Sequence, residues 1–521
     1  MAHTLKGRAM RRNDHSDIFC SSHYTFSIMR RRLSAIAPII VVDRKDGKPL
    51  HLQIYESYRS AIVDRQLRAG QRIPSSRALA TELQISRVPV LTAYAQLLAE
   101  GYFESVTGAG TFISHSLPEQ MTDCKLQSRD IARSSTAPRK LSRNAEQLPR
   151  VLGPAWVRGR GAFSVSQLAF DHFPLKIWSS LMARHCRNVR VSSLHYVDPM
   201  GSEPLREAIA SYLRTARAVR CEARQIMIVN GSQQALEISA RALLDAGDPV
   251  WIEDPGYRMA RFVFMMAGCG LVPVPVDDEG LVVAVGIQRA RNARAVFVTP
   301  SHQFPLGVTM SASRRLELLE WAQKSGSWII EDDYDSEYRY ANRPVASLQG
   351  LDTDSRVIYI GTFSKVLFPS MRLGYMVVPP DLVERFATIR HAIDLGAPEA
   401  YQSALTDFIN EGHFARHLRR MRLLYGTRRR ALVETLNEKF GSALKVIGAE
   451  AGMHLAVLLP NEFRDENVAQ RAALQKLWLW PLSPSYLTES SRQGFILGFG
   501  GTSVEEMPSA VEKLQKLLGV N

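Results

Sequence analysis

One lysine of the chain stands where it could act as a nucleophile toward a carbonyl group. Lys365 lies in VIYIGTFSKVLFPSMRLGY, just after a short apolar run and among hydroxyl and apolar side chains. A lysine that is partly removed from water loses its proton more easily and can then attack an aldehyde. The alternative is an ordinary surface lysine, and this stretch by itself leaves both interpretations open.

A second apolar run, GSWII, is followed by a cluster of acidic residues. Burying an unpaired carboxylate is costly, so a cation is expected close to these side chains. One interpretation is a bound metal ion, with Glu331, Asp332, Asp333 and Asp335 as its ligands. No histidine neighbours the cluster in the sequence, and we therefore expect no metal site.

Two further apolar runs end in residues suited to a phosphate and to a flat ring. Gly231, Ser232 and Gln233 follow one run and begin a predicted helix, where free N–H groups and the helix dipole favour a phosphate. Many strand-to-helix turns have this composition, so the motif is weak alone. Tyr257, in WIEDPGY, follows another run and is free to stack on a ring.

Together these groups are the parts of a site for pyridoxal phosphate. Lys365 would form the Schiff base, and Asp332 would keep the pyridine nitrogen protonated, which makes the ring an electron sink. Tyr334 would bond the phenolic oxygen of the ring, and Tyr257 would stack on its face. The phosphate would be held by four side chains, Ser232, Gln233, Ser364 and Arg372.

The apolar runs predict the fold that positions these residues. Five of them are short and continuous: QIMIV, DPVWIED, ARAVFVTP, GSWIIEDD and RVIYIGTF. Such runs suit strands buried on both faces of a mostly parallel sheet, and predicted helices lie between most of them. Ligands bind outside the carboxyl ends of such strands. We therefore predict an α/β domain over 161–521, with the site at that edge of its sheet.

Residues 49–114 predict a different domain. Two helical segments and a third helix that opens near Ser86 precede two short β-type runs around a glycine-rich tip. This is the order of a winged helix-turn-helix, a mostly helical fold whose third helix enters the major groove of DNA. The alternative is a small structural helical domain with solvated arginines.

The positive charge of the chain is concentrated in its first third. The formal net charge is +14, and residues 1–160 hold 25 Lys and Arg against 13 Asp and Glu. Such an excess is expected of a module that meets DNA phosphates, and also of a basic tail without a partner. We expect 1–48 to be a partly disordered N-terminal extension, and 115–160 to be a flexible basic linker.

Two features of the composition exclude other classes of protein. The five cysteines are scattered without a C-x-x-C pair, so neither a disulfide framework nor a cysteine metal site is expected. The longest apolar stretch, from Phe262 to Val276, is too short and too interrupted to span a membrane, and no secretory signal is visible. We expect a cytoplasmic protein with no membrane partner.

The motifs resemble two known families. GQRIPSSRALATEL, the SR pair, AYAQLLAEGY and GAGTF resemble the GntR-type winged helix. NGSQQAL, IEDPGY, TPSHQFPLG, EDDYDSEYRY and GTFSK with RLGY resemble fold-type-I aminotransferases and, more narrowly, the MocR subfamily of GntR regulators. The resemblance covers nearly everything from Pro49 to the C-terminus.

The resemblance implies a DNA-binding transcription regulator whose second domain has the large and small lobes of a type I transferase dependent on pyridoxal phosphate. It also implies a head-to-tail homodimer, a double-stranded DNA operator and a small effector, either an amino compound or the cofactor. The usual DNA contacts of the family map onto Arg77, Ser86, Arg87 and Thr107. The alternative is an aminotransferase with an accessory DNA-binding domain.

Departures from the two families bear on turnover and on base preference. Phe304 stands where working aminotransferases carry an asparagine that touches the phenolic oxygen of the cofactor. SRQGFILGFGG has no arginine at the position that usually clamps the substrate carboxylate, and Arg492, a few residues earlier, is a weak candidate. Both departures favour sensing over turnover. Leu91 stands where some GntR relatives carry an arginine.

Overall fold

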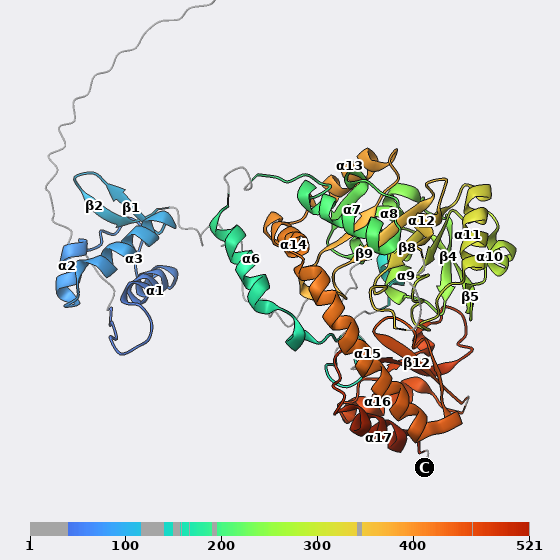
Figure 1. The fold of residues 1–521 in the computed structure, drawn as a ribbon. Helices are drawn as coiled ribbons and strands as arrows, with labels where there is room; N and C mark the ends of the chain where they lie inside the picture. The colour runs from blue at the N-terminus through green and yellow to red at the C-terminus, as the bar shows by residue number, and fades with distance from the viewer. Residues whose placement is uncertain are drawn as a thin grey trace, which may run out of the picture. The chain divides into compact units, whose positions relative to one another are not determined.

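The chain folds into two units, Met1–Arg139 and Lys140–Asn521 (Figure 1). The computed structural model describes residues 40–115, 140–149, 157, 159–165, 167–189, 195–340, 346–460 and 462–519. Most of the predicted N-terminal extension and most of the predicted linker lie outside the described residues. Within the described part of the chain, no helix is long and apolar enough to cross a membrane.

Three helices and a hairpin form the first unit. They are α1 (Leu50–Val63), α2 (Ser76–Glu82), α3 (Arg87–Ala99), β1 (Phe103–Val106) and β2 (Gly110–Ile113). The hydroxyl of Ser75 accepts the N–H of Ala78 and so caps the start of α2. The two strands pair antiparallel around a tip where Gly108 has a φ of +78°. This order confirms the predicted winged helix-turn-helix.

Three aromatic rings form the centre of the first unit. The ring centroids of Tyr58, Tyr94 and Phe103 lie 5.3 to 5.7 Å apart and meet edge to face, an arrangement that stabilises beyond simple burial. The Tyr94 hydroxyl donates to the carbonyl oxygen of Pro74 at 3.0 Å and lies 3.1 Å from the Tyr58 hydroxyl. It therefore links α3 both to α1 and to the residues before α2.

We expect Tyr94→Phe to loosen the first unit, because phenylalanine leaves the buried carbonyl of Pro74 without its donor. An unsatisfied buried acceptor costs about 1–3 kcal/mol, so amides of α1 and α3 should exchange their hydrogens roughly 5- to 150-fold faster. Exchange is measured by mass spectrometry on the full chain. Tyr55→Phe is the matched control, since Tyr55 bonds the exposed Glu100. Equal exchange in the two variants would contradict the expectation.

An eight-stranded sheet organises the second unit, in the order β3-β10-β9-β8-β7-β4-β5-β6. The strands are β3 (Ile226–Val229), β4 (Pro249–Asp254), β5 (Gly270–Asp277), β6 (Gly280–Leu281), β7 (Ala295–Val298), β8 (Trp328–Asp333), β9 (Val357–Thr362) and β10 (Gly374–Val377). The strands from β9 to β5 are parallel, whereas β10 is antiparallel to both β9 and β3. The carboxyl ends of β3, β9, β8, β7 and β4 therefore lie along one edge.

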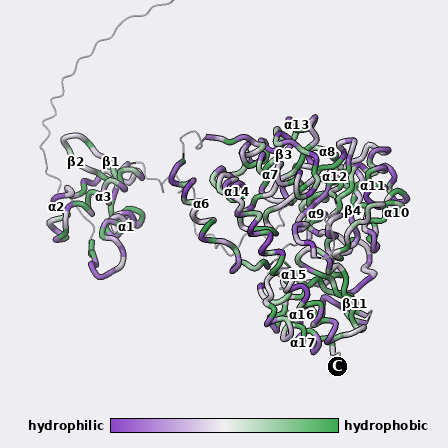
Figure 2. Tube along the Cα trace, viewed as in Figure 1, coloured by the Kyte–Doolittle hydropathy of each residue, from purple (hydrophilic) through white to green (hydrophobic). Residues whose placement is uncertain are grey.

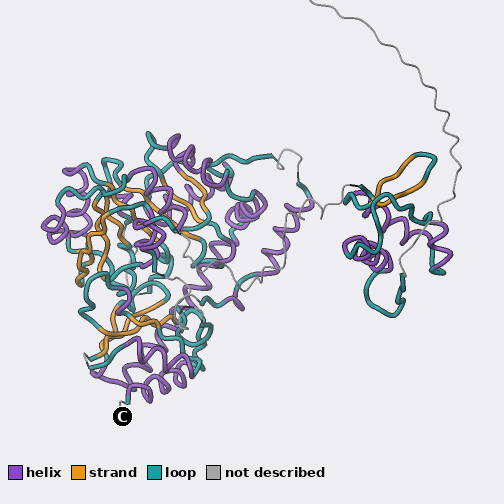
Figure 3. The backbone as a smooth tube through the Cα atoms, turned by 180° about the vertical axis from the view of Figure 1, so that it is seen from behind, coloured by secondary structure: helices purple, strands orange, loops and turns teal. Residues whose placement is uncertain are grey.

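Side chains of the central strands alternate between the two faces of this sheet. Ile252, Phe297 and Ile330 pack with buried residues of three helices, α8 (Ser232–Leu243), α9 (Arg258–Met266) and α13 (Val383–Asp394). Their neighbours Trp251 and Ile329 pack on the other side with α10 (Val283–Ala290), α11 (Ala312–Ser325) and α12 (Leu348–Leu351). Figure 2 shows hydrophobic stretches inside the second unit. β3 and β7 consist of apolar residues throughout, and the strands of this sheet lie among helices (Figure 3), as continuously apolar runs predicted.

A second, four-stranded sheet forms a smaller lobe, in the order β11-β12-β14-β13. Its elements are β11 (Lys445–Ile447), β12 (His454–Leu459), α16 (Asp465–Leu474), β13 (Trp480–Pro481), β14 (Gln493–Gly498) and α17 (Met507–Leu518). The long helix α15 (His413–Phe440) contributes to a hydrophobic cluster that contains residues of both lobes. Together with α6 (Leu175–Arg187), α7 (Glu203–Arg217) and α14 (Glu399–Asn410), these elements confirm the predicted large and small lobes.

Part of the predicted linker is ordered against the second unit. Residues 140–149 include α4 (Arg143–Gln147), and the side-chain amide of Asn144 donates to the carbonyl oxygen of Met266 at 3.0 Å. The described end of the segment after the winged helix thus belongs to the second unit. The linker residues 116–139, 150–156 and 158 are outside the described residues.

Candidate functional site

Residues from several strand ends and from the smaller lobe line one cavity of about 290 Å³. Eight of the residues predicted from the sequence line it, namely Ser232, Gln233, Tyr257, Asp332, Tyr334, Ser364, Lys365 and Arg372. They lie at the edge where the carboxyl ends of the parallel strands meet. The fold therefore brings together side chains that are up to 140 residues apart in the sequence.

One end of the cavity combines a helix start with a guanidinium group. Gly231 precedes α8 with a φ of +102°, and a Cβ atom at this position would lie 3.2 Å from a guanidinium nitrogen of Arg372. Glycine therefore lets Arg372 approach the free N–H groups of the helix start. A guanidinium and a helix N-terminus both favour a phosphate.

Three of the four acidic residues around the end of β8 have protein partners. Glu331 accepts two backbone N–H groups at the start of α12. Asp333 lies 2.8 Å from the guanidinium of Arg217, and Asp335 lies 3.1 Å from Nδ1 of His302. These carboxylates are thus compensated by side chains and backbone of the chain itself.

Asp332 differs, because its carboxylate makes no hydrogen bond or ion pair with the described residues, although its Oδ1 atom is buried. Burial, followed by the neighbouring carboxylates, raises the pKa of Asp332 to about 8, against a smaller lowering by Lys365. Burial also lowers the pKa of Lys365. A cationic ring nitrogen beside Asp332 would supply its missing donor, and a neutral lysine amine can attack an aldehyde. The residues of the cavity therefore fit pyridoxal phosphate.

The two tyrosines of the cavity are held by neighbouring residues. The Tyr334 hydroxyl donates to the carbonyl oxygen of His302 at 2.9 Å and lies 3.2 Å from the Nδ1 atom of the same residue. The Tyr257 hydroxyl accepts from the Gln233 amide at 3.5 Å, and its ring meets that of Phe304 edge to face at 5.6 Å. Tyr257 thus forms a wall of the cavity, as a ring that stacks on a ligand must.

Several residues of the cavity were not predicted from the sequence. Thr299 and Thr362 follow or end apolar runs, and a search for hydroxyls at strand ends could have found them. His454 and Trp480 come from β12 and β13 of the smaller lobe, and no sequence signal connects them to Lys365. Val165, Pro369 and Met453 complete this set.

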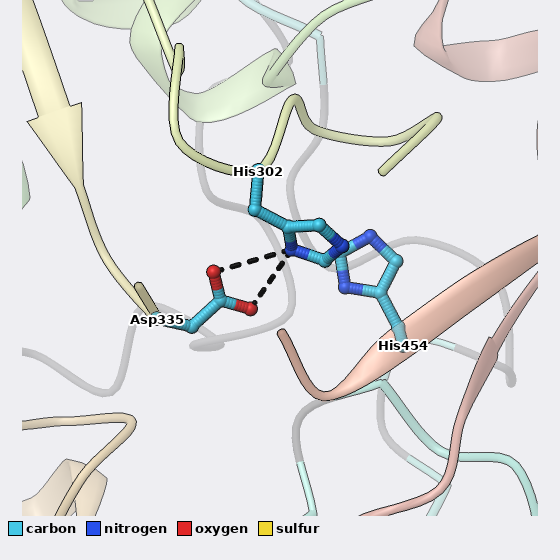
Figure 4. A group of neighbouring side chains, drawn as sticks. All are labelled: His302, Asp335 and His454. Atoms are coloured by element: carbon cyan, nitrogen blue, oxygen red, sulfur yellow. Dashed lines mark hydrogen bonds and ion pairs between the residues drawn. The ribbon is translucent and has the colours of Figure 1, made fainter. Parts of the chain in front are cut away.

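His302, Asp335 and His454 form a buried cluster at the wall of the cavity (Figure 4). The Nδ1 atom of His302 lies 3.1 and 3.2 Å from the two oxygens of Asp335, and the two imidazole rings are 4.6 Å apart. The sequence places no histidine beside the acidic cluster, yet the fold brings two of them to Asp335. These three side chains could together ligate a metal ion, and the absence of a metal therefore stays a prediction.

Arg492 is not among the described residues that line the cavity. It precedes β14 and is partly exposed, and its carbonyl oxygen accepts from the Ser490 hydroxyl at 2.7 Å. The predicted contact of this arginine with a ligand carboxylate gains no support from its position.

The four predicted DNA contacts, Arg77, Ser86, Arg87 and Thr107, are exposed on the first unit. At the start of α3, the Nε atom of Arg87 donates to the Ser76 hydroxyl at 3.1 Å, which orients the guanidinium. Val88 and Leu91 on the same helix are 69% and 44% exposed. The start of α3 therefore presents one arginine beside apolar side chains, which suit thymine methyl groups.

The excess positive charge lies mainly outside the winged helix. Residues 50–113 hold six Lys and Arg against five Asp and Glu, so most of the excess in the first third belongs to the flanking segments. The overall charge of this region therefore indicates basic flanks, and the interpretation of the fold as a DNA-binding module rests on its architecture.

Comparisons with known proteins assign a family to each unit. The family "Bacterial regulatory proteins, gntR family" matches residues 50–113, and "Aminotransferase class I and II" matches 163–514. The chain is 38% identical over 477 residues to a probable rhizopine catabolism regulatory protein MocR of Rhizobium meliloti. The aligned residues cover 92% of this chain and 95% of the relative. The chain belongs to the MocR-type GntR regulators. It is a DNA-binding transcription regulator with an aminotransferase-like domain.

Further relatives of this MocR-type regulator fall into two groups. A pyridoxine biosynthesis regulator, PdxR of Corynebacterium glutamicum, is 31% identical over 462 residues, with 88% of this chain and 94% of the relative covered. Among solved structures, a multiple substrate aminotransferase of Thermococcus profundus matches with a TM-score of 0.67 at 27% identity, over 73% of this chain and 97% of the neighbour. The second unit thus has the fold of aminotransferases that use pyridoxal phosphate, as predicted.

We expect Asp332→Asn to change stability and cofactor binding in opposite directions. Burial in the folded chain raises the pKa of Asp332 from its ordinary value of 3.8 to about 8. Between about pH 4 and 8 the Asp332 side chain is ionised in the unfolded chain but protonated in the folded chain. Rising pH therefore increasingly favours the unfolded state over this range. The cofactor-free variant should melt above the wild type by a margin that grows over this range. Its affinity for pyridoxal phosphate should fall roughly 10- to 150-fold, as expected for a lost charged hydrogen bond of about 1.5–3 kcal/mol.

The matched control is Glu337→Gln, which neutralises a buried carboxylate whose pKa is also raised, to about 7, and which is absent from the lining of the cavity. It should leave the affinity for pyridoxal phosphate unchanged. Melting curves against pH and a cofactor titration measure both effects. Equal cofactor affinity in Asp332→Asn and the wild type would contradict the role given to Asp332.

Proposed function

We propose that this MocR-type regulator binds pyridoxal phosphate through a Schiff base at Lys365, and that a small amino compound or the cofactor itself, bound there, changes its affinity for DNA. The observation that carries the proposal is the convergence of Lys365, the unpartnered Asp332 and the end formed by Gly231 and Arg372 in one cavity. When bound, the cofactor supplies an aldehyde that condenses with amines and a ring that accepts electrons.

Each predicted residue has a part in holding this cofactor. Asp332 would pair with the ring nitrogen, Tyr334 would bond the phenolic oxygen of the ring, and Tyr257 would cover one ring face. The phosphate would lie against the start of α8, with contacts from Ser232, Gln233, Ser364 and Arg372. The support for these roles is that the side chains share one cavity and that Gly231 keeps its phosphate end open.

On the DNA side, Arg87 and Ser86 would contact the major groove and Arg77 and Thr107 the backbone of a double-stranded operator. Two copies joined head to tail would present two winged helices, and hence read paired half-sites. We place this activity in the cytoplasm. A ligand can change the affinity for DNA only if it binds one arrangement of the two DNA-binding domains more tightly than another.

The experiment is a binding titration of the full chain with double-stranded DNA from the region upstream of its own gene. Affinity is measured by fluorescence anisotropy without additions, with pyridoxal phosphate, and with pyridoxal phosphate plus candidate amines. We expect specific binding that weakens as salt rises, and an affinity that changes severalfold on adding the ligands. Identical affinity in all three conditions would contradict sensing.

The alternative is an aminotransferase with an accessory DNA-binding domain, and the similarity to solved aminotransferases favours it. Steady turnover of an amino donor with a keto acid, together with DNA binding that ignores sequence, would support that alternative. Phe304 in the lining of the cavity, in place of the asparagine of working enzymes, argues for sensing. Transfer of a single amino group per cofactor remains compatible with regulation.

A further inference from the structure

Among the described residues of the cavity, the charged side chains leave no cation for a carboxylate of a second ligand. Lys365 and Arg372 are the only lysine and arginine among the described residues that line it, and Asp332 and Asp335 are its acidic residues. Arg372 lies beside Gly231, at the end that fits a phosphate. Lys365 is the group that fits the aldehyde. Both cations are therefore engaged once the cofactor is bound.

Arginines of the surrounding elements are engaged away from the cavity. Arg217 pairs with Asp333 at 2.8 Å and donates to the Ser301 hydroxyl at 2.8 Å. Arg261 lies 3.6 Å from Asp254 in a buried pair. Neither of them lines the cavity, and neither does the arginine that the sequence offered as a carboxylate clamp.

The remaining polar groups near the cavity favour a cation over an anion. His454 is buried, and burial, with His302 and Lys365 as smaller causes, lowers its pKa well below the ordinary value, so it is neutral. Asp335 is held by the ring of His302 at 3.1 Å and by the backbone N–H of Met453 at 3.3 Å. A ligand carboxylate would meet these groups without a compensating cation, which is costly in a buried site.

An aromatic wall faces the same space. The Phe304 ring lies 5.6 Å from the ring of Tyr257, 5.4 Å from that of His454 and 6.4 Å from that of Tyr334, measured between centroids. Trp480 of the smaller lobe adds an indole to the lining. Such rings pack well against the body of an organic ligand, and their faces attract an ammonium group.

We propose that the ligand sensed in this cavity is a primary amine that carries no carboxylate, and that its body packs against the wall of Tyr257, Phe304 and Trp480. This inference rests on the proposed attachment of pyridoxal phosphate at Lys365, which assigns both cations of the cavity to the cofactor. We expect the cavity to bind amines that lack a carboxylate and to reject the corresponding α-amino acids.

The test uses pairs of ligands that differ only in the carboxylate. The cofactor-loaded full chain is titrated with 2-phenylethylamine against L-phenylalanine, and with pentylamine against L-norleucine. Binding is followed by the change in the absorption of the cofactor and, in parallel, by the change in DNA affinity. We expect each amine to bind at least tenfold more tightly than its amino acid. Equal or tighter binding of the amino acids overturns the inference, and so does a loaded protein that responds to none of the four.

Two variants locate the cause of the preference. Asp335→Asn removes one carboxylate of the cavity and should narrow the ratio between amine and amino acid severalfold, whereas Arg492→Ala should leave that ratio unchanged. A selective loss of amino-acid binding in Arg492→Ala would show that this arginine clamps a carboxylate, and would overturn the inference. Wild-type protein that takes up no cofactor contradicts the proposed function itself, which is a different result from a loaded protein with the opposite preference.

Discussion

Lys365→Ala protein, purified with added pyridoxal phosphate, should lack the absorption of a lysine-bound cofactor and should no longer change its DNA affinity when an amine is added. The reason is that alanine has no amine to condense with the aldehyde of the cofactor. The loss should be complete, because no second lysine is found among the described residues of the cavity. Affinity for DNA without ligand should stay within about twofold of the wild type, since the winged helix is a separate unit.

Lys324→Ala is the control for this experiment. Lys324 is an exposed residue of α11 that pairs with Glu320 on the same helix, and its loss should leave the absorption and the DNA response intact. If the Lys365→Ala protein retained a normal response to amines, sensing would not depend on the lysine-bound cofactor.

Arg87→Ala should weaken binding to the operator by roughly 5- to 150-fold, which corresponds to the loss of about 1–3 kcal/mol expected for an arginine at a base edge. Arg87 is the one arginine in the exposed first turn of α3, and its Nε atom is oriented by the Ser76 hydroxyl at 3.1 Å. Ser76→Ala should therefore produce a smaller loss of the same kind. The absorption of the bound cofactor should be unchanged in both variants.

Arg68→Ala separates this effect from a simple loss of charge. Arg68 is exposed in the first unit and lies between α1 and α2, away from α3 in the sequence. Its loss should weaken binding to operator DNA and to unrelated DNA by the same factor. That factor should be smaller than the loss of operator binding in Arg87→Ala. If Arg87→Ala and Arg68→Ala reduced operator binding equally, a specific role for Arg87 at the groove would be contradicted. Anisotropy titrations at two salt concentrations give both comparisons.

The sequence predicted the large sheet and the winged helix well because their signals are local. Five of the eight strands of the large sheet, β3, β4, β7, β8 and β9, are apolar runs that end in a polar residue or are followed by one, and parallel pairing then places those ends together. Lys365, Asp332 and Tyr257 could be found in this way from residue types and spacing. The three helices of the first unit were equally visible, because each has one buried stripe and a recognisable start.

The rest of the site depends on contacts that no local pattern encodes. His454 and Trp480 reach the cavity from a second sheet, whose position is set by packing of the smaller lobe and by the long helix α15. The pairing of Asp335 with His302 joins residues that look unrelated in the sequence. Charge was misleading for another reason: a sum over 160 residues could not show that the excess lies in the flanks of the winged helix.

The measurement closest to the central claim is reduction of the cofactor-loaded chain with borohydride, followed by digestion and mass spectrometry of the peptides. Reduction turns an imine between a lysine and pyridoxal phosphate into a stable amine linkage. We expect one modified peptide, the one that contains Lys365, and reduced protein whose DNA affinity no longer responds to added amines. An unmodified Lys365 peptide, or a label spread over surface lysines, would contradict it.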